Sequence, residues 1–181
     1  PDETNFWWHG TSVASVAAAL TDNDLLMAGG SWHGKVLPIQ VHSHGGFGLE
    51  RAALINTYKL LARMFGMYCG GVAPPQNYNV RVINMSYGGP YFDWCDAYWL
   101  YYRLSLRATC VASAGYTNAQ GVPILTYPAA ISYKLTLRFG QYVEDYVLGL
   151  TGYDYRGYRP WDFNYGFWNA DVCAPGVDVI A

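Results

Sequence analysis

The sequence has few charged residues, no basic cluster and no long uninterrupted apolar segment. Only 13% of its 181 residues are charged, and 11 Lys and Arg against 13 Asp and Glu give a net charge of -2. Binding to phosphate groups needs clustered Lys and Arg, so we expect no nucleic-acid partner. Arg63 and Arg103 interrupt the longest apolar stretches, and no signal-peptide pattern is present, so we expect no membrane partner.

Cysteine is also scarce, and the acidic residues do not gather. Cys69, Cys95, Cys110 and Cys173 lie far apart without a CxxC pair, which disfavours a zinc site and favours buried free thiols. The acidic turn at residues 21–24 carries the oxygen ligands that calcium prefers, but a lone acidic turn is more typical of solvated surface. We therefore expect no required cofactor and assign no calcium.

What the chain does contain is 52% apolar residues, enough for one domain with a core, in an alternation of helical and strand patterns. This alternation predicts an α/β fold with a mainly parallel sheet, followed by an aromatic, turn-rich stretch at 153–169. The helical patterns cover residues 11–20, 49–65 and 93–107, and the strand patterns cover residues 35–42, 80–87, 108–115, 132–139 and 145–152.

Glycine-rich loops follow three of the predicted strands, at residues 43–48, 86–90 and 114–118. The carboxyl ends of parallel strands meet at one edge of a sheet, where ligands bind, so these loops predict the functional edge. The alternative interpretation is that these glycines serve only to form tight turns and have no part in ligand binding. A nucleotide-binding domain is disfavoured because HSHGGFGLE, after the first predicted strand, lacks the GxGxxG spacing.

His9 stands at the start of the first predicted helix, in FWWHGTSVASVAAAL, with Thr11 and Ser12 as candidate helix caps. Taken alone, a histidine before a helix is more often a structural or surface group than a catalyst. The order of the other motifs decides between these interpretations.

Seven motifs occur in one order along nearly the whole chain: HGTSVASVAAAL, KVLPIQV, VINMSYGGP, VASAGYTN, YPAA, FNYG and DVCAPGVDVIA. In content and order they resemble the subtilisin-like serine proteases. The resemblance implies a three-layer sandwich with a mainly parallel sheet and helices on both faces, a polypeptide substrate and a secreted protein. The chain begins with Pro1 and stops inside an apolar run, so we expect residues 1–181 to be a partial peptidase domain, truncated at both ends.

The resemblance makes His9 the catalytic histidine. GTSVAS also looks like the family's nucleophile motif, but the family order Asp, His, Ser places the serine after the APG segment, so Ser12 is a helix-start residue. Asp2 lies too close to His9, with no strand before it, to be the catalytic aspartate. The serine is expected beyond Ala181, so this chain alone is expected to be inactive.

The other implied site residues lie in the two loops. Tyr116 occupies the oxyanion-hole position, where the family has asparagine, and the candidate substitutes are the Tyr116 hydroxyl and the nearby Asn118. This departure supports the second hypothesis, a catalytically inactive protease-like module that binds peptides. In either case the peptide would add as an extra strand between two walls. One wall comprises Ser86, Tyr87, Gly88 and Gly89, and the other comprises Ser113, Ala114 and Gly115.

Overall fold

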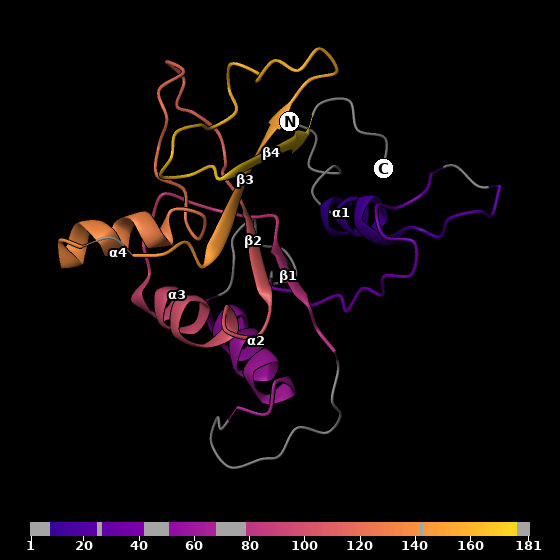
Figure 1. Cartoon of the computed structure of the whole chain (residues 1–181), viewed down its shortest axis with the longest axis horizontal. Helices are drawn as coiled ribbons and strands as arrows, with labels where there is room; N and C mark the ends of the chain where they lie inside the picture. The colour runs from indigo at the N-terminus through magenta and orange to yellow at the C-terminus, as the bar shows by residue number, and fades with distance from the viewer. Residues whose placement is uncertain (1–7, 25–26, 42–50, 68–78, 142, 177–181) are drawn as a thin grey trace. The chain divides into compact units, whose positions relative to one another are not determined.

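The computed structural model describes residues 8–24, 27–41, 51–67, 79–141 and 143–176, and it divides into two compact units (Figure 1). The first unit comprises Pro1–Gln40 with Asp178–Ala181, and the second comprises Val41–Val177.

The first unit contains the predicted helix, α1 (His9–Ala18). This helix begins before the expected caps: Trp8 is the N-cap residue and makes no side-chain cap, so Thr11 and Ser12 lie inside the first turn. At the other end, the N–H groups of Gly30 and Ser31 donate to carbonyls in the last turn at 2.9 Å each, which satisfies acceptors that a helix end leaves free.

The strand predicted at residues 35–42 is wrong for the described part, because residues 35–41 have no regular secondary structure and residues 35–38 are exposed. An apolar run becomes a strand only when a neighbouring strand satisfies its backbone groups. Pro38 has no N–H to offer, and no described strand pairs with this segment.

The second unit is built on a parallel sheet whose strand order follows the chain: β1 (Val82–Met85), β2 (Thr109–Ser113), β3 (Val147–Tyr153) and β4 (Val172–Pro175). The predicted strands at 80–87, 108–115 and 145–152 are thereby confirmed, as is the α/β class. All neighbouring strands are parallel. Their carboxyl ends therefore lie along one edge.

Two of the predicted helices are confirmed in this unit. The helix α2 (Arg51–Met64) buries Leu54, Tyr58 and Leu61, three residues at helical spacing. The helix α3 (Trp94–Trp99) has Asp93 as its N-cap residue, whose carboxylate accepts the Cys95 N–H at 2.7 Å. It continues as a π-helical segment (Leu100–Leu104). None of the described helices is long and apolar enough to cross a membrane.

The strand predicted at residues 132–139 is wrong, because this segment forms the helix α4 (Ile131–Phe139). The alternation of Leu135, Leu137 and Phe139 suggested a strand, but the buried positions follow helical spacing. Ile131 and Leu135 are each 1% exposed, whereas Leu137 is 59% and Phe139 is 51% exposed. Gly140 ends the helix in the left-handed conformation, with φ of 67°.

The helices α3 and α4 connect β1 to β2 and β2 to β3, both in the same direction across the sheet. Right-handed crossovers of this kind place both helices on one face. The helix α2 packs against α3 and the π-helical segment, so it joins the same layer (Figure 1). Helices on the opposite face stay a prediction.

The loops beyond the sheet are held together by a buried side chain, Asn164, which is 0% exposed. Its Nδ2 donates to the carbonyl oxygens of Ala114 at 2.8 Å and Ile124 at 2.6 Å, and it lies 3.2 Å from the hydroxyl of Thr126. Its Oδ1 accepts the N–H of Ile124 at 3.2 Å. The Asn164 amide therefore joins the loop after β2, at Ala114, to the segment at Ile124 and Thr126.

A second buried amide, Asn169, reinforces this connection. Its Oδ1 accepts the N–H of Thr126 at 3.0 Å, and its Nδ2 donates to the carbonyl of Ile124 at 2.7 Å. Its own backbone carbonyl lies against Gly149 of β3, where a Cβ atom would overlap the oxygen. Asn164 and Asn169 thus tie the loops to the sheet.

The contacts of Asn164 predict that Asn164→Asp is strongly destabilising. The change keeps the shape but turns a buried donor, which faces three oxygen atoms, into an acceptor or a buried charge. We expect the free energy of unfolding, measured with urea at pH 7, to fall by about 3 kcal/mol.

The matched control is Asn118→Asp, because Asn118 uses its Oδ1 to accept the N–H groups of Gln120 and Val122. A carboxylate does the same, so the control should change stability by less than about 0.5 kcal/mol. Equal losses at both sites would contradict the role given to Asn164.

Candidate active site

The loop at residues 86–90 leaves β1 at the carboxyl edge of the sheet and is fixed at its base. Gly89 and Tyr127 pair antiparallel, with Gly89 donating to the Tyr127 carbonyl at 3.0 Å and Tyr127 to the Gly89 carbonyl at 2.8 Å. At the start of the loop, the Asn84 amide donates to the Ser86 hydroxyl at 2.8 Å. Gly88, between these anchors, is exposed.

The loop at residues 114–118 leaves β2 at the same edge. Ala114 is 0% exposed and donates its N–H to the Leu150 carbonyl at 2.8 Å. Gly115 has φ of 76°, a conformation that favours glycine, and its N–H donates to the Ser113 hydroxyl at 3.2 Å. The chain therefore turns sharply away from the sheet at the end of this wall.

The side chain of Thr126 lies where the two walls meet. A Cβ atom on Gly88 would come within 2.6 Å of the Thr126 methyl group, and a Cβ atom on Gly115 within 2.7 Å of its hydroxyl. Thr126 itself is 5% exposed. The structure thus brings the predicted walls together around one buried threonine, and their part in substrate binding stays a prediction.

Tyr116, at the predicted oxyanion-hole position, is 62% exposed. Its backbone bridges that of Phe163, and its ring meets the Phe163 ring edge-on with centroids 5.6 Å apart. The nearby Asn118 uses its side-chain oxygen to hold its own turn. An oxyanion needs hydrogen-bond donors, and both the Tyr116 hydroxyl and the Asn118 Nδ2 group are donors by type.

His9 is the first residue of α1 and is exposed. It belongs to the first unit, whereas the sheet belongs to the second. Ser12 lies in the first turn of the same helix, donates its N–H to the Trp8 carbonyl at 2.8 Å, and accepts the Ser15 hydroxyl at 2.9 Å, which fits a helix-start residue. The approach of His9 to the loop at 86–90 stays a prediction. The loop at 43–48 and Asp2 lie outside the described residues.

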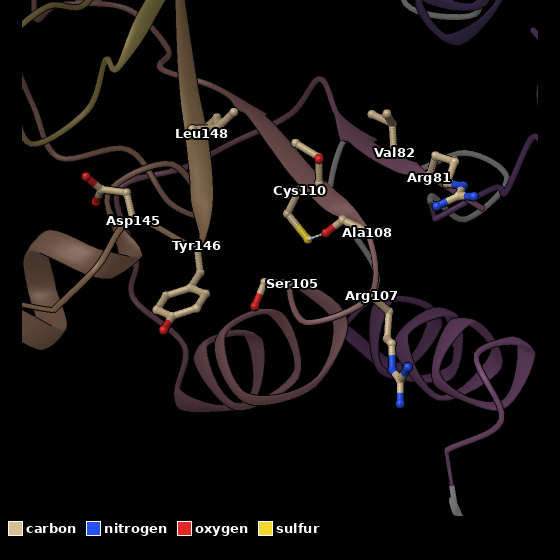
Figure 2. Close-up of a pocket in the computed structure, with 10 residues that line it drawn as sticks. Arg81, Val82, Ser105, Arg107, Ala108, Cys110, Asp145, Tyr146 and Leu148 are labelled. Carbon is tan, nitrogen blue, oxygen red and sulfur yellow. Dashed lines mark hydrogen bonds between the residues drawn. The ribbon is translucent and has the colours of Figure 1, made fainter. Parts of the chain in front are cut away.

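A cavity of about 570 Å³ opens at the other, amino-terminal edge of the sheet (Figure 2). It is lined in part by Cys110, Asp145 and Tyr146. Burial raises the pKa of the Cys110 thiol to about 12, so the thiol stays protonated at neutral pH and is no nucleophile. Arg107 points away from Cys110 (Figure 2). Cys110 therefore gives this cavity no activated thiol.

The described residues contain no group of three or more His, Cys, Asp and Glu side chains able to hold a metal ion. In the acidic turn at 21–24, Asp22 and Asp24 are exposed and adopt left-handed conformations, with φ of 57° and 54°. The three described cysteines are free: Cys110 is buried, as expected, while Cys95 is half-buried and Cys173 is exposed.

Sequence patterns did not single out Asn164, Asn169 or Thr126. Asn164 does stand inside the motif FNYG, and Thr126 directly precedes YPAA, both of which are among the seven ordered motifs. A polar residue within an aromatic, turn-rich stretch looks like surface. The burial of these side chains can be recognised only in the folded structure, where the loops that they join lie together.

Comparisons with known proteins identify the family of the chain. The family model described as "Subtilase family" matches residues 1–178. An "Extracellular protease" of Xanthomonas campestris pv. campestris is 37% identical over 83 residues, which is 45% of this chain and 13% of that protein. A solved structure described as proteases from Pseudoalteromonas arctica PAMC 21717 is similar with a TM-score of 0.69 and 26% identity, over 93% of this chain and 44% of that one. The chain thus spans less than half of either relative. Because the family match covers nearly all of it, the chain belongs to the subtilase family of serine-type peptidases.

Proposed function

We propose that this chain is the histidine-bearing part of a secreted subtilisin-like serine endopeptidase. The observation that carries the proposal is the convergence of the two glycine-containing walls around Thr126, at the edge where parallel sheets bind ligands. Segments outside residues 1–181 supply the aspartate and the serine. The protein that joins this chain to those segments is called the complete protease below. Secretion is supported by the relative named as an extracellular protease.

The proposed substrate is an extended polypeptide, which binds between the walls at 86–89 and 113–115. Backbone can approach backbone closely at Gly88 and Gly115, because neither carries a side chain and a Cβ atom at either would press on Thr126. The side chain before the cleaved bond then points toward Thr126. A buried threonine between the walls favours moderate-sized apolar side chains over charged ones.

In the proposed reaction, His9 takes the proton of the serine hydroxyl as the serine attacks the peptide carbonyl, and then gives it to the leaving amine. The aspartate holds the imidazole in the correct tautomer. Tyr116, which is 62% exposed, lies where the family places the asparagine that stabilises the oxyanion. The donor there is the Tyr116 hydroxyl or the side-chain amide of the nearby Asn118. The reaction needs no cofactor, and we expect this chain by itself to hydrolyse no peptide.

The first test is His9→Ala in the complete protease. Removing the general base should lower kcat for a peptide ester by about 10⁶-fold, a magnitude known from this family, with little change in KM. His33→Ala is the matched control, because His33 is an exposed histidine of the same unit, and it should leave kcat unchanged. Hydrolysis that survives His9→Ala would place the catalytic site elsewhere.

The second test is Tyr116→Asn in the complete protease. If the tyrosine hydroxyl is a poorly placed donor, restoring the family's asparagine should raise kcat by about 10²-fold, the value of one oxyanion donor in this family. Tyr155→Asn, at another exposed tyrosine, should have no effect on kcat. A complete protease that binds peptides but hydrolyses none, with or without Tyr116→Asn, would instead support the peptide-binding module.

A further inference from the structure

The loop between β3 and β4 (Figure 1) pairs with the loop that carries Tyr116, through an antiparallel backbone bridge from Phe163 to Tyr116. Two backbone hydrogen bonds flank this bridge: from the Thr117 N–H to the Asp162 carbonyl at 2.8 Å, and from the Asn164 N–H to the Gly115 carbonyl at 3.0 Å. Residues 162–164, called the bridging segment below, therefore hold both chain neighbours of Tyr116. Any group that fixes the bridging segment also fixes where Tyr116 lies.

The side chain of Arg159 holds the bridging segment and the residues just before it. The Nη1 nitrogen of Arg159 lies within hydrogen-bond distance of three backbone carbonyl oxygens: those of Pro160 at 2.8 Å, of Trp161 at 3.4 Å, and of Phe163. The guanidinium lies over the ring of Tyr165, with Cζ 4.2 Å from the ring centroid. Within the described residues, Arg159 forms no salt bridge with an acidic side chain. Its partners are therefore the backbone of its own loop and one aromatic ring.

Three carbonyl oxygens that converge on one atom need a positive charge there. Each oxygen carries a partial negative charge, so the three repel one another unless a cation lies between them. A guanidinium carries that charge together with N–H donors, and such charge-assisted hydrogen bonds are about twice as strong as neutral ones. Within the described residues, Arg159 is also the only donor to the Phe163 carbonyl. Without Arg159 the loop loses both the charge and this hydrogen bond.

A turn at residues 154–158 holds the backbone that leads to Arg159. Asp154 directly follows β3, and its Oδ1 accepts the N–H groups of Arg156 and Tyr158 at 2.9 Å each. The turn is closed by the Asp154 N–H, which donates to the Tyr158 carbonyl at 2.9 Å. Arg159 is exposed, but it starts from a turn fixed to the sheet and meets four partners in one loop.

We propose that Arg159 is a positioning residue of the peptidase: by binding three carbonyl groups of its own loop, it fixes the bridging segment and thereby places Tyr116 at the substrate site. Arg159 acts through the backbone at 162–164 and touches no reacting atom. The inference rests on the proposed function only in that the loop carrying Tyr116 lies beside the cleaved bond.

The wall at 113–115 and Tyr116 should respond differently to the loss of Arg159. The wall is also held by the sheet, because Ala114 donates its N–H to the Leu150 carbonyl at 2.8 Å. Tyr116 lies beyond this hydrogen bond and is 62% exposed, so its position depends on the bridging segment. Removing Arg159 should therefore displace Tyr116 more than the wall, and so lower kcat more than it raises KM.

The first measurement is hydrogen exchange in the complete protease, which needs no catalysis. Arg159→Met should speed exchange of the Thr117 and Asn164 amides by at least about fivefold, without changing exchange in β2 and β3. The matched control is Arg156→Met. Arg156 lies in the same loop and stacks on the Tyr155 ring at 5.0 Å, but its Nε donates to the Tyr155 hydroxyl and not to a carbonyl. Equal exchange in both variants, or the same acceleration throughout the sheet, would overturn the proposal.

The second measurement is hydrolysis of a peptide ester by the complete protease, with active sites counted by reaction with a sulfonyl fluoride. Arg159→Met should lower kcat by at least about tenfold and change KM by less than about twofold, whereas Arg156→Met should change neither. Arg159→Lys should keep kcat within about threefold of the unaltered protease, because its ammonium offers three N–H donors to the three carbonyls. A lysine variant as slow as the methionine variant would contradict the role of the positive charge.

Together the two measurements separate this proposal from the proposed function. Faster exchange of the Thr117 and Asn164 amides with an unchanged kcat would overturn the part given to Arg159 in the reaction. A complete protease that hydrolyses no ester, but shows the expected exchange in Arg159→Met, would overturn the proposed function and not the hold of Arg159 on the bridging segment. Unchanged exchange in an active protease would overturn the positioning role alone.

Discussion

The candidate site depends on one buried side chain, the amide of Asn164. Loops that leave a parallel sheet carry backbone donors and acceptors that the sheet no longer pairs, and those groups need partners wherever the loops are buried. The Asn164 side chain is the hydrogen-bond partner of the Ala114 carbonyl and of both the carbonyl and the N–H of Ile124. It also lies against the Thr126 hydroxyl. Asn164 therefore helps to hold Thr126 between Gly88 and Gly115, and so to fix the separation of the two walls.

The sequence predicts those parts of the fold whose pattern reflects a local cause. The strands β1, β2 and β3 are short apolar runs, and α2 repeats its apolar residues at helical spacing, so all four could be predicted. Residues 35–41 and the helix α4 could not, because an apolar run needs a partner strand and because an alternation of leucines hides which of them are buried. The tertiary environment decides both cases.

The site, like the fold, could be predicted from the sequence only where a residue type has a local cause. The glycines of the two walls were found because close backbone approach and a positive φ restrict the residue type, as at Gly115. Thr126 and Asn164 were not found, because their importance lies in contacts with segments distant in the sequence.

The proposed function requires that peptides bind between the walls at 86–89 and 113–115, with His9 beside the cleaved bond. A crystal structure of the complete protease, carrying His9→Gln and an uncleaved peptide, tests this most directly. We expect an extended peptide whose backbone pairs with both walls and one side chain of which is directed at Thr126. Residue 9 should lie within about 3.5 Å of the scissile group or the serine. A peptide bound at another edge of the sheet, or residue 9 remote from it, would contradict the claim.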